Sequence, residues 1–103
     1  MKSLSTIQQQ LVHGDFEFSQ HAFQRSVARN IANHEIREAG ANAQRIEDYP
    51  DDKYSPSCLL LGFTKARRPL HLQVSYADMP KVKIITLYEP DLREWAADFS
   101  RRK

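Results

Sequence analysis

The chain has 103 residues, 41% of them hydrophobic, which matches one ordinary domain and leaves no room for a second core. Its formal net charge of +2 is mildly basic and falls well short of the imbalance that identifies a nucleic-acid binder unaided. A single cysteine excludes an intramolecular disulfide, and the longest apolar run, residues 59–61, is far too short to cross a bilayer. We therefore expect one cytoplasmic domain over residues 1–103, without membrane contact.

Helical spacing of apolar residues dominates the first part of the chain. It predicts three helices, at residues 4–13, 20–30 and 33–43. Gly14 is typical of the position just beyond a helix end, and Ser19 and Asn33 are typical N-cap residues. Phe16–Phe18 is expected to be a brief extended segment that leads into the second helix.

The second predicted helix has two faces of different chemistry. Phe23 and Val27 lie one turn apart and are expected to face the core. His21, Arg25 and Arg29 also follow at one-turn intervals, on nearly the opposite side, and form what we call the cationic stripe. Such a stripe can hold a phosphate between guanidiniums while the imidazole moves a proton, although a solvated helix face has the same pattern.

The second half of the chain changes to strand-like patterns. Four strands are expected, at residues 43–49, 57–65, 69–77 and 81–88. The turns between them are short, so neighbours can pair only as antiparallel strands in a meander. After Pro90 and Asp91, apolar residues at helical spacing predict a closing helix at residues 92–99, anchored by Trp95. The sequence therefore predicts an α+β fold with N-terminal helices packed on a four-stranded antiparallel sheet and a short C-terminal helix.

Two of the predicted strands carry polar side chains that could do chemistry. Strict alternation places His71 on the opposite face from its leucine neighbours, which indicates a polar, open sheet face. An exposed or hydrogen-bonded structural histidine is the alternative. Thr86 and Tyr88 are expected on the same face as Val82 and Ile84, where hydroxyl groups interrupt an apolar strand.

The pattern offers little for metal or cysteine chemistry. The four histidines lack HxH, HExxH or CxxC spacing, so neither a metal nor another cofactor is expected. Cys58 opens an apolar strand, where a buried and inert thiol is the commonest outcome.

Four motifs, taken in order, resemble a known family. They read SQHAFQRSVARNI, IEDYPDDKYSPSCLLLG, RPLHLQVSYA and KVKIITLYEPDLREW. Over Ser19–Trp95 the chain resembles the family of unknown function numbered 4258, whose pattern runs from an H-A-x-x-R helix through I-E-x-Y-P to P-L-H and I-T-x-Y-x-P. The resemblance implies a relation to the small α+β group that includes the RelE and ParE toxins and certain colicin nuclease domains.

Many members of that group cleave RNA without a metal. The family signature falls on five candidate catalytic residues, His21, Arg25, His71, Thr86 and Tyr88. The candidate substrate-binding residues are basic: Arg29, Arg67 and Arg68.

The resemblance implies cleavage of RNA by transesterification. His71 or His21 would act as base and acid, the arginines of the cationic stripe would stabilise the phosphorus centre, and Tyr88 would bond or stack. The implied partners are RNA and a cognate antitoxin protein. The chief alternative is a non-catalytic domain that binds a protein or nucleic acid through the same basic surface, and a third is a stand-alone housekeeping domain without toxicity.

Overall fold

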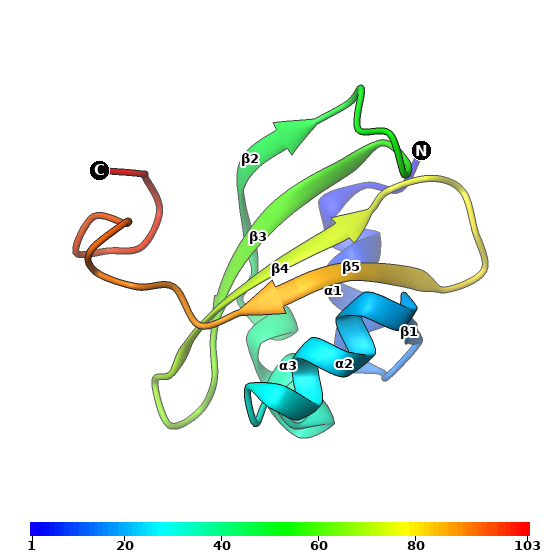
Figure 1. The fold of residues 1–103 in the computed structure, drawn as a ribbon. Helices are drawn as coiled ribbons and strands as arrows, with labels where there is room; N and C mark the ends of the chain where they lie inside the picture. The colour runs from blue at the N-terminus through cyan, green and yellow to red at the C-terminus, as the bar shows by residue number, and fades with distance from the viewer.

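The computed structural model describes residues 1–103 and places three helices against one face of a five-stranded sheet (Figure 1). The helices are α1 (Leu4–Val12), α2 (Gln20–Ala28) and α3 (Asn33–Ala41). The strands are β1 (Phe16–Phe18), β2 (Gln44–Tyr49), β3 (Ser57–Phe63), β4 (Pro69–Ser75) and β5 (Val82–Tyr88). The α+β class predicted from the sequence is thereby confirmed. None of the helices combines the length and apolar character that crossing a membrane requires.

The sheet is mixed, so the expected four-stranded antiparallel sheet is wrong by one strand. Strands β2 to β5 form the predicted antiparallel meander, and β1 adds to its β5 edge in the parallel direction. Phe16 pairs with Val82 and Phe18 with Ile84. A three-residue strand whose partner lies more than sixty positions away has no local sequence signal that identifies it as a strand.

The helix ends follow the predicted capping with one exception. The Ser19 hydroxyl caps α2 by accepting from the Ala22 N–H at 3.0 Å, and Gly14 adopts the left-handed conformation after α1 with φ of 78°. Asn33 was expected to cap α3 but is its first helical residue. Ala32 holds the cap position, and its N–H donates to the Glu35 carboxylate at 3.0 Å.

The face of the sheet beneath the helices is an apolar core. It contains buried leucine, isoleucine, valine and alanine side chains from all three helices and from β3, β4 and β5. Gly40 lets α3 approach α1, because a Cβ there would collide with Leu11. Gly62 lets α3 rest on β3 in the same way, because a Cβ would meet the carbonyl group of Ala39.

Helix α2 faces the core with small residues, which reverses the expected orientation. Phe23 and Val27 are 57% and 65% exposed, while Ala22 and Ser26 are buried. The helix follows directly on β1 and lies close to β5, since the Ser19 N–H that begins it donates to a β5 carbonyl at 3.0 Å. Only small side chains fit at this short distance, so the larger residues turn outward.

The opposite face of the sheet is covered by residues 89–103, which we call the C-terminal segment, and the predicted helix at residues 92–99 does not form. This segment, orange to red in Figure 1, lies away from the helices. The carboxylates of Asp91 and Asp98 accept from the backbone N–H two residues on, at 2.8 and 3.0 Å, which favours turns over a helix. Phe99 also adopts a φ of 63°, which a helix does not allow.

Candidate functional site

The face beneath the C-terminal segment is closed over His71, which corrects the expected open face. His71 is fully buried, and the Trp95 ring packs edge-on against its imidazole with the ring centroids 4.3 Å apart. Arg102 holds this cover in place: it pairs with Glu47 of β2 at 2.9 and 3.1 Å, and its guanidinium lies 4.7 Å from the centre of the Trp95 ring. His71 therefore cannot touch a substrate in this arrangement.

A chain of hydrogen bonds connects His71 to the surface through Tyr88. The His71 Nε2 lies 2.8 Å from the carbonyl oxygen of Phe99, and a carbonyl can only accept, so Nε2 carries the proton. In the neutral ring, Nδ1 is then an acceptor, and the Tyr88 hydroxyl donates to it at 3.1 Å. Burial lowers the pKa of His71, although the bond to Phe99 opposes this, so the neutral form is favoured. Burial also raises the pKa of Tyr88, which keeps the phenol protonated.

Tyr88 reaches this face because β5 contains a bulge. In the pairing with β4, Gln73 lies opposite Thr86 and Val74 lies opposite Ile84. Ile85 is therefore an extra residue, and it reverses the alternation of side chains between the two faces of the sheet. Thr86 and Tyr88 consequently lie on the face opposite to Ile84, not on the shared face that strict alternation predicted. Without the bulge, the Tyr88 hydroxyl would point toward the helices.

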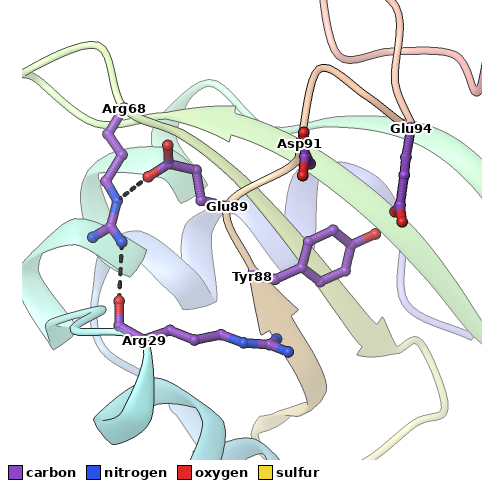
Figure 2. Close-up of a pocket in the computed structure, with 6 residues that line it drawn as sticks. All are labelled: Arg29, Arg68, Tyr88, Glu89, Asp91 and Glu94. Atoms are coloured by element: carbon purple, nitrogen blue, oxygen red, sulfur yellow. Dashed lines mark hydrogen bonds and ion pairs between the residues drawn. The ribbon is translucent and has the colours of Figure 1, made fainter.

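The exposed edge of Tyr88 forms one wall of a cavity of about 520 Å³. Its lining residues are Arg29, Arg68, Tyr88, Glu89, Asp91 and Glu94. Figure 2 shows the Tyr88 ring between the Arg29 side chain on one side and the Asp91 and Glu94 carboxylates on the other. The cavity therefore joins the end of α2, the β3–β4 turn and the C-terminal segment.

Arg29 is the arginine of this cavity whose positive charge is not paired with a carboxylate. Its Nη1 donates to the Leu87 carbonyl at 2.7 Å, and its guanidinium lies 5.9 Å from the centre of the Tyr88 ring. It forms no ion pair, unlike Arg68. Because one end of the guanidinium is fixed by a backbone carbonyl, the remaining N–H groups stay available for an anion.

Arg68 is engaged with other parts of the protein. It forms ion pairs with Glu89 at 2.7 Å and Glu35 at 3.0 Å. It also donates to the carbonyls of Arg29 and Asn30, at 3.1 and 2.9 Å. The hydrogen bond that Arg68 donates to Glu89, and then the one that it donates to Glu35, raise the pKa of Arg68 despite partial burial. Arg68 therefore ties the end of α2, the start of α3 and the C-terminal segment together.

The three carboxylates of the cavity were not identified from the sequence. They lie within six residues of the end of β5, which is Tyr88: Glu89, Asp91 and Glu94. Their closeness in sequence to this candidate catalytic tyrosine could have identified them. The side-chain and backbone hydrogen bonds from Arg93 lower the pKa of Asp91, so it is ionised at neutral pH. Three carboxylates against two guanidiniums leave the cavity with a formal excess of one negative charge.

The structure gathers some predicted site residues and separates others. His71, Tyr88, Arg29 and Arg68 lie together around the cavity and beneath it. His21 and Arg25 are exposed on α2 and line no part of it, and Arg67 is exposed in the β3–β4 turn with φ of 67°. Thr86 shares the sheet face of Tyr88 but stands opposite Gln73, outside the cavity lining. No group of three or more histidine, cysteine, aspartate or glutamate side chains is arranged to hold a metal ion.

Comparison with known protein families identifies a match over most of the chain. A family model described as a domain of unknown function, DUF4258, matches residues 18–89, well over half of the chain. No curated protein and no solved structure matches. The matched region includes α2, Tyr88 and all the strands from β2 onward, and it ends where the C-terminal segment begins.

Proposed function

The chain belongs to the DUF4258 family of unknown function, as its four motifs predicted, and we propose from its site that it is a metal-independent endoribonuclease. One observation supports the proposal most: a tyrosine that lines a cavity beside an unpaired arginine donates its hydroxyl to a buried neutral imidazole. These are the groups that transesterification of an RNA phosphodiester needs, namely a proton acceptor next to a fixed positive charge.

Tyr88 and His71 would act as a proton relay. The Tyr88 oxygen takes the proton of the ribose 2′-hydroxyl while its own proton moves to Nδ1 of His71, which becomes an imidazolium held by the Phe99 carbonyl. The 2′-oxygen attacks the adjacent phosphorus, and the bond to the 5′-oxygen breaks to leave a cyclic phosphate. The 5′-oxygen takes a proton from solvent, and His71 later releases its extra proton to solvent through Tyr88, which restores the neutral imidazole. His71 is thus a positioning and relay residue rather than a group that touches RNA.

Arg29 would stabilise the negative charge that develops on the phosphate oxygens. Fixed donors aimed at such charge usually supply the largest part of the rate enhancement. The Asp91 and Glu94 carboxylates on the opposite wall would disfavour a second phosphate there and so limit how RNA enters.

The test is cleavage of a mixed-sequence RNA by purified protein in excess EDTA, with fragments analysed for cyclic phosphate ends. Tyr88→Phe removes the hydroxyl and should lower the rate by about 10²-fold or more. Tyr76→Phe is the matched control, because Tyr76 lies beyond the end of β4, away from the cavity, and should leave the rate unchanged. Equal rates for Tyr88→Phe and the wild type would refute the assignment.

A non-catalytic binding domain is the alternative that the same site supports. The burial of His71 and the engagement of Arg68 by two carboxylates both suit a fixed binding surface. Absence of cleavage of any RNA, free or ribosome-bound, with binding retained would favour this alternative.

The relation to RelE and ParE toxins, a cognate antitoxin and a cytoplasmic setting are further parts of the proposal. The helices-then-meander order and the buried free thiol of Cys58 are consistent with them. Growth arrest on expression, relieved by Tyr88→Phe, would support the toxin assignment over the housekeeping one.

A further inference from the structure

A second cavity, of about 730 Å³, opens at the beginning of α2 and shares no residue with the first. It is lined by the last residue of β1, by the first turns of α2, by two residues of β5 and by the β2–β3 loop. Three of its side chains, His21, Tyr54 and Lys83, carry groups that nucleic acids bind. The proposed catalysis uses none of them.

The aromatic member of this cavity is Tyr54. Its side chain is 55% exposed, so a ring face is available for a planar ligand. The backbone N–H of Tyr54 donates to the Asp52 carboxylate at 3.1 Å, which helps to fix the loop that carries the ring. An exposed aromatic ring offers a face on which a nucleobase can stack, so a base is the ligand that Tyr54 suits best.

Lys83 supplies a positive charge on the β5 side of the same cavity. Its Nζ lies 3.4 Å from the Glu17 carboxylate. Burial would lower the pKa of Lys83, but the neighbouring Glu17 and Tyr54 oxygens raise it, so the ammonium stays charged. A cation beside an exposed aromatic ring is the usual composition of a single-strand binding site.

The cationic stripe connects the two cavities. His21 lines the second cavity and Arg29 the first, and Arg25 lies between them on the same stripe of α2. Eight residues of helix separate His21 from Arg29, which corresponds to about 12 Å along the axis. Neither His21 nor Arg25 forms an ion pair, so both are free to meet phosphates.

We propose that single-stranded RNA lies along α2, with its phosphates on the cationic stripe and one base stacked on Tyr54. This inference rests on the proposed function, because it places the bond to be cleaved beside Tyr88 in the first cavity. The substrate is then a strand several nucleotides long, and a dinucleotide reaches only the first cavity.

The test compares Tyr54→Ala with the wild type on two substrates, a single-stranded RNA of about ten nucleotides and a dinucleotide. A stacked base contributes about 1–3 kcal/mol, so kcat/KM for the long RNA should fall about 5- to 150-fold while that for the dinucleotide is unchanged. Tyr54→Phe keeps the ring and should restore activity. Phe63→Ala is the matched control, because Phe63 is an exposed aromatic residue that lines neither cavity.

Binding of the same labelled RNA, measured by fluorescence anisotropy, separates the two proposals. If the wild type cleaves RNA but Tyr54→Ala and Lys83→Ala change neither cleavage nor binding of the long strand, the second site is refuted and the ribonuclease proposal stands. If no RNA is cleaved, the ribonuclease proposal fails, and weaker binding by Tyr54→Ala still supports the second site. If no RNA is cleaved and Tyr54→Ala binds the long strand as tightly as the wild type does, the second site is refuted as well.

Discussion

The two faces of the sheet are closed in different ways. One is covered by regular helices that bring mainly apolar side chains to it, and the other by the C-terminal segment, which has no helix or strand. Buried polar groups gather on the second face, where His71 bonds to Tyr88 and to the segment itself, and Gln73 bonds to Ser57. No buried side-chain polar atom lacks a partner. An apolar face can be closed by any well-packed surface, whereas a polar face needs a cover that supplies specific acceptors.

The largest expected effect tests whether the irregular cover packs as firmly as the helices. We expect Trp95→Ala to lower the free energy of unfolding by about 3–5 kcal/mol, similar to the 2–5 kcal/mol expected for Leu72→Ala on the helix side, because both side chains are fully packed. Urea denaturation followed by far-UV circular dichroism measures both. Leu92→Ala in the same segment is 54% exposed and should change stability by less than about 0.5 kcal/mol. A loss below about 1 kcal/mol for Trp95→Ala would mean that the segment is only loosely attached.

A smaller effect is expected where the two coverings meet, at Arg68. Its removal leaves the carboxylate of Glu35, which is mostly shielded from solvent, without its charged donor. We expect Arg68→Ala to cost about 1–3 kcal/mol of unfolding free energy. Arg67→Ala removes the same charge from the neighbouring exposed position and serves as the control, with a change near zero. Equal effects of the two variants would show that Arg68 contributes only net charge.

The smallest expected effect is a pH dependence confined to the polar face. Because burial lowers the pKa of His71 below its ordinary value of 6.5, the unfolded chain binds a proton that the folded protein does not. Stability contributed by neutral His71 is complete above that value and is lost as the pH falls toward the folded pKa. We expect a lower urea midpoint at about pH 5 than at about pH 7, before the carboxylates titrate.

Titration of the His71 ring by NMR identifies the group responsible. Glu35, Glu47, Asp91 and Asp98 have lowered pKa values, so their contribution is lost only at more acidic pH. A His71 pKa at or above 6.5 would contradict the prediction and remove the basis for a neutral imidazole in the relay.

Periodicity predicted the elements of the helix side well because that side depends mainly on apolar contacts. The positions of α1, α2 and the four meander strands all follow from spacing. The predicted core-facing side of α2 was wrong, because the hydrophobicity of a residue does not show how closely the helix approaches the sheet. Ala22 and Ser26 face the core where the helix is too close to the sheet for Phe23 or Val27.

The polar side was predicted less well because its key features depend on tertiary context. The Ile85 bulge sets the direction of Tyr88, and strict alternation along this β-branched strand did not predict it. The burial of His71 depends on Trp95, and Trp95 reaches it only because a predicted helix is broken by aspartate turns. The motifs predicted which residue types occur at the site, but they did not predict which of these residues lie close to one another in the fold.

The positions of α1 and the C-terminal segment on the two faces of the sheet (Figure 1) limit how far the chain can be truncated. The region that sequence comparison recognises, residues 18–89, excludes both α1, which supplies Ile7 and Leu11 to the core, and Trp95, which closes the other face. An excised fragment with those limits would expose apolar surface on one side and His71 on the other. The region that the family model matches is therefore shorter than the part of the chain that builds both covers of the sheet, and a graft or minimal domain should include α1 and Trp95.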